Sequence, residues 1–427
     1  LPTEPIATRS TTVAPPRRRP AGAHPAPAPS RRARRVERDA TKSTRRLRRE
    51  RIVRRVLVGA LVVVLLFPAW SWYRAISAEG TDPFLARSVE WLRDNGMSGA
   101  VDWIEHWWYT HHEPPVGGRP EHGLPKAQAP TGEAAAAPDA PAAPVHEHLT
   151  PPPPMQPLVA EPLDGEGVWQ PTGRTVAGVP AVYTSFFRPD AIHTSLVAGA
   201  MWMDTTLLTT KFVPGLQEPG GPQTLGAQVP PELRPGLVAA FNSGFKIESS
   251  KGGVYTEGQV VAPLVDGAAS FVINKDGQAS VGAWGRDFQM GPDIASVRQN
   301  LALILDNGQP APGLPNNADG AWGASVGNEV YVWRSGVGVD ANGALVYVAG
   351  PAMSAQTLAV LLQRAGCVRA MELDINAPWT TGYTYEQTDP ADPAAVQGVK
   401  LLPNMPRDNN RYLTPGERDF FALFAAY

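Results

Sequence analysis

The chain has 427 residues and a nearly balanced charge, with 38 Lys and Arg against 40 Asp and Glu. The balance hides two unlike parts: residues 1–55 carry 17 basic and 4 acidic side chains, whereas the rest carries 21 basic and 36 acidic ones. The single cysteine, Cys367, excludes a disulfide framework and a cysteine-based zinc site. Together with 45 prolines and 41 glycines, this patterning excludes a simple compact cytosolic protein.

Residues 1–50 consist mainly of Pro, Ala, Ser and Arg, and such a composition predicts a disordered basic tail. Residues 52–74 follow as a predicted transmembrane helix, because residues 56–73 are a run of 18 residues without a charge. Basic flanks stay in the cytoplasm, so the N-terminus is expected inside and the C-terminal part outside, in a single-pass protein of the cell membrane. The alternatives are a cleaved signal peptide, which the long charged N-terminal region disfavours, and nucleic-acid binding by the tail.

Three further segments complete the predicted organisation. Residues 82–112 have the apolar spacing of short amphipathic helices, which would pack either on the membrane surface or on the main domain. Residues 113–165 are a Pro-rich linker, expected to act as an extended spacer. Residues 166–427 are long enough to form one large domain.

The pattern of this domain predicts an α/β or α+β fold, a mixed strand-rich sheet domain with few helices. Hairpins are expected to turn at residues 275–277 and 341–343, where Asp-Gly and Asn-Gly interrupt apolar runs. A helix is expected over residues 354–365, with a strand over 368–375 after it. Residues 414–424 read as a closing helix, whose phenylalanines would dock on the core.

The strand predicted over residues 370–376 carries the most informative polar residues. Side chains alternate across a strand, so Glu372, Asp374 and Asn376 would share one face. Two carboxylates two residues apart lie roughly 7 Å apart, a spacing that suits an acid and a base around one glycosidic bond. The alternative is a salt bridge to a neighbouring strand, for instance to Arg334.

Other candidate site residues lie elsewhere in the domain. Asn242 follows a predicted strand and can bind a sugar hydroxyl or a phosphate. Arg334 can grip a phosphate with two hydrogen bonds or pair with a carboxylate. No cofactor is certain, although the oxygen-rich cluster around Asp374 could hold a divalent cation. Residues 323–327 match a serine-nucleophile motif, but a predicted strand follows where that motif needs a helix.

Five segments in this order resemble the phosphodiester glycosidase family. The segments are Phe-Asn-Ser-Gly-Phe at 241–245, Phe-Val-Ile-Asn-Lys-Asp-Gly at 271–277, Arg-Ser-Gly-Val-Gly at 334–338, the helix at 354–365 and Ala-Met-Glu-Leu-Asp at 370–374. The resemblance covers about residues 236–385, and it implies the fold of the family and cleavage of sugar-1-phosphate diesters. It places Asn242, Arg334 and Asp374 on the Asn, Arg and Asp of the family pattern. The chain departs from that pattern after Asp374, where residues 375–379 replace a run of glycines.

Residues and resemblance together predict a membrane-anchored extracytoplasmic glycosidase of sugar-1-phosphate diesters or related envelope glycans, with Glu372 and Asp374 as acid and base. Heavy use of Ala, Pro, Arg and Gly favours a bacterial source with GC-rich DNA. The alternative is a non-catalytic envelope protein that binds glycan through exposed rings of Trp379, Tyr383 and Tyr385. The expected partners are therefore the membrane and an envelope glycan or sugar phosphate, with nucleic acid the least favoured.

Overall fold

The computed structural model describes residues 30–78, 82–130, 147–315, 321–322 and 331–427. The serine motif at 323–327 and most of the predicted N-terminal tail lie outside the described residues. The chain divides into two compact units, residues 1–71 and residues 72–427.

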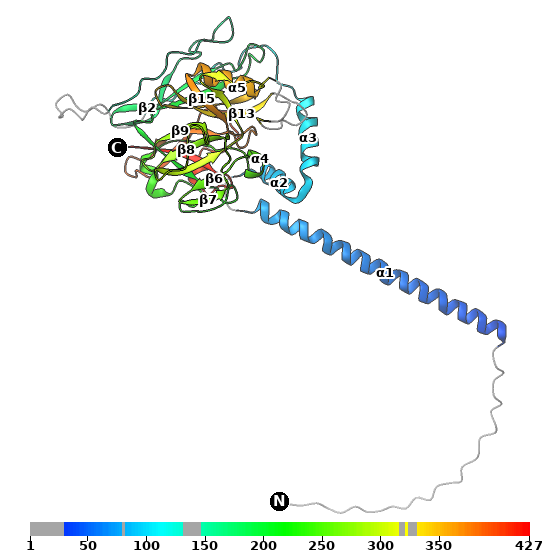
Figure 1. The fold of residues 1–427 in the computed structure, drawn as a ribbon. Helices are drawn as coiled ribbons and strands as arrows, with labels where there is room; N and C mark the ends of the chain where they lie inside the picture. Colours follow the sequence, from blue (N-terminus) through cyan, green and yellow to red (C-terminus); the bar gives the residue numbers. More distant parts are fainter. Residues whose placement is uncertain (1–29, 79–81, 131–146, 316–320, 323–330) are drawn as a thin grey trace, which may run out of the picture. The chain divides into compact units, whose positions relative to one another are not determined.

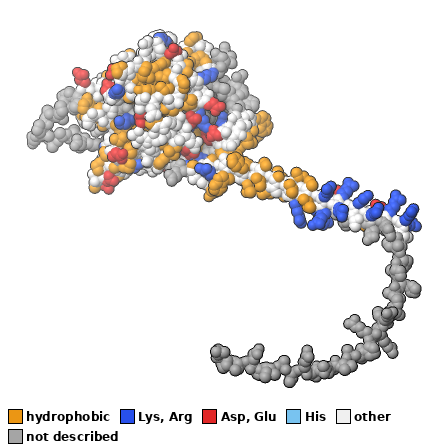
Figure 2. All heavy atoms as spheres, turned by 60° about the horizontal axis from the view of Figure 1, so that its bottom comes forward, with side chains coloured by type: hydrophobic (Ala, Val, Ile, Leu, Met, Phe, Trp, Pro, Cys, Tyr) orange, Lys and Arg blue, Asp and Glu red, His pale blue; other side chains and the backbone are white. Residues whose placement is uncertain are grey.

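The first unit holds most of one long helix, α1 (Arg31–Ile76). Figure 2 shows basic side chains along its first half and apolar ones along its second half. By length and composition, the apolar part is long and apolar enough to cross a membrane. Residues 31–50 are helical here, although their composition predicts disorder.

The second unit begins with α2 (Phe84–Leu92), a π-turn η1 (Arg93–Met97) and α3 (Ser98–His111), as the amphipathic spacing predicts. The aromatic face of α3 is exposed, with Trp103 at 67% and Trp108 at 53%. Three sheets and a few short helices make up the rest of the unit, so the predicted strand-rich mixed fold is confirmed (Figure 1).

Every pair of neighbouring strands in these sheets is antiparallel. The eight-stranded sheet has the order β1 (Gln170–Val176), β2 (Val179–Phe187), β3 (Ala198–Met203), β14 (Leu345–Met353), β13 (Val332–Asp340), β15 (Cys367–Glu372), β11 (Leu303–Asp306) and β12 (Gln309–Pro310). One five-stranded sheet has the order β7 (Gln259–Ala262), β6 (Val254–Thr256), β10 (Ile294–Gln299), β8 (Ala269–Asn274) and β9 (Ala279–Ala283). The other has the order β17 (Val396–Lys400), β16 (Gly382–Gln387), β5 (Leu237–Asn242), β18 (Phe420–Ala425) and β4 (Leu208–Val213).

The main apolar core lies where these sheets face one another, and it draws residues from all three, among them Phe241, Phe271, Met371 and Phe421. A second core packs α5 (Ala355–Arg364) on the eight-stranded sheet. The Ser354 hydroxyl caps α5 as predicted by accepting a hydrogen bond from the Thr357 amide at 2.9 Å. The described residues also include three short helices: η2 (Pro231–Gly236), α4 (Ile247–Ser250) and η4 (Arg411–Leu413).

The prediction of a closing helix over residues 414–424 is wrong, because Phe420–Ala425 form β18, an interior strand of its sheet. Its two neighbours, β5 and β4, supply the missing hydrogen bonds on both edges. Phe421 packs in the main core, whereas Phe420 packs in the core on the opposite face of this sheet. A strand buried on both faces has no alternation of apolar and polar residues, so periodicity cannot distinguish it from a helix.

The Pro-rich segment does not extend away from the domain where the structure describes it. The Gly117 amide donates to the Ile192 carbonyl at 2.7 Å, and the Gln128 side chain donates to Glu386 at 2.8 Å. On the far side of the undescribed residues 131–146, Met155 is buried in the second core. The described parts of this segment are therefore bound along the domain surface, contrary to the expectation of a spacer.

Candidate functional site

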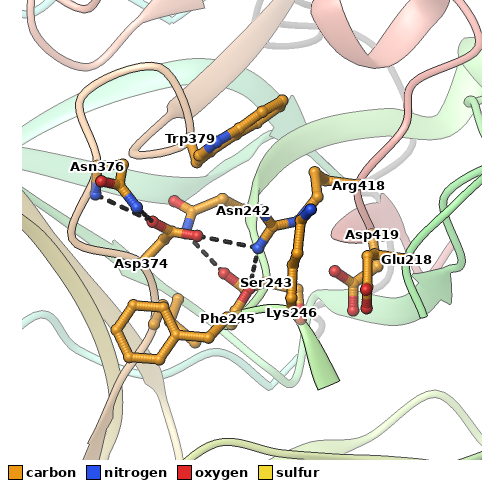
Figure 3. Close-up of polar contacts among 12 residues, drawn as sticks. Glu218, Asn242, Ser243, Phe245, Lys246, Asp374, Asn376, Trp379, Arg418 and Asp419 are labelled. Carbon is orange, nitrogen blue, oxygen red and sulfur yellow. Dashed lines mark hydrogen bonds and ion pairs between the residues drawn. The ribbon is translucent and has the colours of Figure 1, made fainter. Parts of the chain in front are cut away.

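The candidate site lies where two sheets meet. Strand β5 of one sheet ends in the loop Ser243-Gly-Phe-Lys246, and β15 of the other ends just before Asp374. The approach to β18 brings Arg418 to the same place (Figure 3). Three segments that are far apart in the sequence thus converge around one carboxylate.

Asp374 is that carboxylate, and only 1% of its surface is exposed. One oxygen accepts the Asn376 amide at 3.0 Å and the Asn376 side chain at 3.2 Å, and the other accepts Arg418 at 3.1 Å (Figure 3). Burial raises the pKa of Asp374 above its ordinary value, although Arg418 and Asn376 act in the opposite direction. The site therefore holds an oriented carboxylate that is more basic than one in water.

The backbone around Asp374 is fixed by Ser335 and Asn242. The Ser335 amide donates to the Asp374 carbonyl at 2.9 Å, and the Asp374 amide donates to the Ser335 hydroxyl at 3.2 Å. The Asn242 side chain donates to this hydroxyl at 3.0 Å and accepts from Tyr347 and from the Thr381 amide. Because Asn242 is buried and already bonded to four groups, it positions the site from beneath rather than meeting a ligand.

Asn300 ties the two loops together and was not found from the sequence. Its side chain accepts the Phe245 amide and donates to the carbonyls of Glu372 and Leu373 at 2.8 and 3.0 Å. This close approach requires a glycine in the loop, because a Cβ at Gly244 would lie 2.7 Å from the Asn300 side-chain carbon. The glycine at position 244, in the Asn-Ser-Gly turn, was the sequence signal that could have indicated this close contact.

Glu372 and Arg334 pair with each other, which is the alternative that the sequence left open. Both side chains are at most 2% exposed, and the Arg334 guanidinium also donates to the Met353 carbonyl at 2.7 Å. Burial raises the pKa of Glu372, against the opposing effect of Arg334. Glu372 and Arg334 are therefore bound to each other inside the protein. Glu372 is not available as a second free carboxylate beside Asp374.

The aromatic rings expected to be exposed are buried. Trp379 is 4% exposed, and the guanidinium groups of Arg407, Arg411 and Arg418 lie 5.1 to 5.3 Å from its ring centre. Tyr383 and Tyr385 are fully buried in the third core, behind the sheet. Trp379 thus supports the arginine that holds Asp374, and the expectation of exposed stacking rings is wrong.

Asp306, another acidic residue at a strand end, lies away from the site. It pairs with Arg286 at 2.6 Å, and both line a cavity of about 400 Å³. Strand β11 is antiparallel to β15, so Asp306 lies near Val368, at the opposite end of β15 from Asp374. Within the described residues, no three His, Cys, Asp or Glu side chains gather so that they could hold a metal ion.

A group of charged residues connects the segment before α2 to the domain beside Arg418. Asp82 forms a buried ion pair with Arg407, and Glu417 lies close to this pair with 6% of its surface exposed. Burial, together with the charges of Asp82 and Glu90, raises the pKa of Glu417 to about 7. This carboxyl therefore changes its charge near neutral pH.

We expect Glu417→Gln to stabilise the protein above pH 7. The pKa of Glu417 is 4.5 in the unfolded chain and about 7 in the folded one. The contribution of the Glu417 carboxyl to the free energy of unfolding is therefore fully present below pH 4.5 and is lost as the pH rises through 7. Thermal unfolding at pH 8 should show a gain on the order of 1 kcal/mol that disappears at pH 4.5. The exposed Glu232 offers a matched control, Glu232→Gln, and an equal gain in that control would contradict the prediction.

Comparisons with known proteins agree with the resemblance noted in the sequence. Residues 235–374 match the family model described as phosphodiester glycosidase, a stretch that begins just before β5 and ends on Asp374. The match therefore confirms the resemblance, and it contains the loop after β5 and the chain as far as Asp374. A comparison with curated proteins finds no match.

Three solved structures are also similar to the chain. The catalytic domain of zebrafish N-acetylglucosamine-1-phosphodiester alpha-N-acetylglucosaminidase, auto-inhibited by its pro-peptide, is 14% identical with a TM-score of 0.38, covering 58% of this chain and 84% of its own. A hypothetical protein from Synechocystis is 12% identical, with a TM-score of 0.32 and coverages of 60% and 64%. An exported protein from Burkholderia pseudomallei is 12% identical, with a TM-score of 0.28 and coverages of 53% and 74%.

Proposed function

We propose that the chain is a glycosidase that cleaves the bond between a sugar and phosphate in sugar-1-phosphate diesters. The family match over residues 235–374 supports the reaction class, and its last residue is the carboxylate at the centre of the site. In this proposal Asp374 takes a proton from the attacking water. The water oxygen bonds to the anomeric carbon, and the bond from that carbon to the phosphate oxygen breaks.

The observation that carries this proposal is that Asp374 is an oriented carboxylate held by Arg418, with the ammonium group of Lys246 on the loop after β5. Hydrolysis of an ordinary glycoside needs two carboxyl groups, because the departing alcohol must receive a proton. A phosphate monoester is the anion of a strong acid and departs without that proton. A single base, Asp374, with cations nearby therefore suits a phosphate leaving group better than a sugar alcohol.

The alternative of a glycan-binding protein without catalysis loses its support, because it relied on exposed rings. Trp379, Tyr383 and Tyr385 are all buried, so none of them offers a face to a sugar. The polar groups around Asp374 remain the only binding elements that the sequence and the described structure bring together in this region.

We further propose that α1 anchors the protein in the cell membrane, with the catalytic domain outside and an envelope glycan or sugar phosphate as substrate. The apolar second half of α1 supports the span. The excess of basic residues before it supports a cytoplasmic N-terminus, because such residues are retained on that side.

We expect the full-length protein, purified in detergent, to release free sugar from a diester of α-N-acetylglucosamine-1-phosphate, for which a nucleotide sugar serves. The matched control is the uncharged methyl α-N-acetylglucosaminide, which should be cleaved at least about tenfold more slowly because its alkoxide leaving group needs an acid. Free sugar is measured by a reducing-end assay. Faster cleavage of the uncharged glycoside, or no cleavage of either substrate by a folded protein, would contradict the proposal.

A further inference from the structure

Lys246 is the basic residue whose surroundings the site description leaves unexplained. Its ammonium group pairs with Glu90 of α2 and with Asp94 of η1, the latter at 2.9 Å. The lysine side chain is 20% exposed and the Glu90 side chain 16%, so these charges are largely removed from water. Two carboxylates from a segment about 150 residues earlier in the chain thus meet at one lysine.

This lysine belongs to the site rather than to the outer surface. It ends the loop after β5 that begins with Ser243, and Figure 3 shows it near Arg418 and Ser243. The charge of Glu90 raises the pKa of both Asp374 and Arg418, so Glu90 lies within electrostatic range of the catalytic carboxylate. Segment 90–94 therefore places negative charge near the site.

Two buried groups in the same region, on Ser243 and Arg418, lack a hydrogen-bond partner among the described residues. The Ser243 hydroxyl, in a residue only 2% exposed, makes no hydrogen bond to the described residues. The same holds for the Nε of Arg418, in a residue 8% exposed. A buried donor without an acceptor is destabilising, so these groups favour a ligand rich in acceptor oxygens.

We propose that Lys246, with the Ser243 hydroxyl and Arg418 Nε, binds the phosphate of the substrate, and that Glu90 and Asp94 hold Lys246 when no substrate is bound. Lysine is a common phosphate ligand and serves as a point charge. Carboxylate and phosphate oxygens offer it the same kind of contact, so the two compete for one cation. This inference rests on the proposed function for the identity of the ligand.

Competition requires two substitutions to act in opposite directions. Lys246→Met removes the cation and should weaken binding of inorganic phosphate to the full-length protein by at least tenfold. The double variant Glu90→Gln, Asp94→Asn removes the competitors and should tighten binding by roughly tenfold, because more of the protein is then ready to bind. Isothermal calorimetry on protein in detergent measures both effects without turnover.

Matched controls are the exposed residues Lys211 on β4 and Glu113 after α3, as Lys211→Met and Glu113→Gln. Neither should change phosphate binding. If Lys246 only ties α2 to the domain, both test variants break the same tie and shift binding in the same direction or not at all, which would overturn the inference.

The result separates this inference from the proposed function. Opposite shifts in phosphate binding would support the phosphate site even if no diester were cleaved, in which case the glycosidase proposal alone fails. Diester cleavage with a KM that is equal in wild type, Lys246→Met and the double variant would support the glycosidase and overturn the phosphate site.

Discussion

Replacing Asp374 with Asn should lower kcat/KM for a sugar-1-phosphate diester by about 10²–10⁴-fold, the usual contribution of a general base. The amide keeps the shape of the carboxylate and can still accept Arg418, but it cannot take a proton from water. The activity of the wild type should fall as the pH is lowered through the pKa of Asp374, because a protonated carboxyl cannot act as a base. Burial raises this pKa above its ordinary value. Initial rates over a pH series measure both effects.

The matched control for this experiment is Asp306→Asn. Asp306 is also an acidic residue at a strand end paired with an arginine, but it lies at the opposite end of β15. Its replacement should leave kcat/KM within about twofold of the wild type. Circular dichroism and the melting temperature establish that both variants are folded, and full activity in a folded Asp374→Asn variant would reject the assignment.

Replacing Arg334 with Met should destabilise the protein by about 3–5 kcal/mol, because it leaves Glu372 charged and unpaired in the interior. The double variant Arg334→Met, Glu372→Gln should recover most of this loss, since it leaves no isolated charge. Urea unfolding of the single and double variants, followed by tryptophan fluorescence, measures the difference.

The single and double variants of Arg334 and Glu372 also distinguish a structural ion pair from a catalytic or phosphate-binding one. In the structural case, the folded double variant retains cleavage of the diester at low urea, within about an order of magnitude of the wild type. A double variant that is stable yet inactive would return Arg334 or Glu372 to the reacting groups. Equal stability of wild type and Arg334→Met would show that the buried pair does not form.

Signals that act over a few residues were sufficient for much of the fold. The hairpins β8–β9 and β13–β14 turn where Asp-Gly and Asn-Gly predict, and α5 begins at its Ser354 cap. Turn and cap preferences depend on local backbone geometry, so distant parts of the chain do not override them. The prediction for residues 414–424 was wrong because β18 is stabilised by hydrogen bonds to β4 and β5. Strand β4 lies about 200 residues earlier in the chain.

The site was predictable in part for the same reason. Asp374 was found because it follows a buried strand and matches the family pattern, but β15 ends at Glu372, so the strand alternation expected for Glu372, Asp374 and Asn376 does not hold. Arg418 carried no signal, since it follows an unremarkable Pro-Gly-Glu and reaches Asp374 only through the tertiary fold. The burial of Trp379 was equally hidden, because it depends on three arginines that the fold assembles around one ring.

The Pro-rich segment that is bound along the domain surface has a consequence for where the protein finds its substrate. Since this segment does not lengthen the connection, only the seven residues between Ile76 of α1 and Phe84 of α2 separate the proposed span from the folded unit. Seven extended residues reach about 25 Å. With the anchoring and activity proposed above, so short a connection would favour substrates rooted in the same membrane, because encounters with them are two-dimensional.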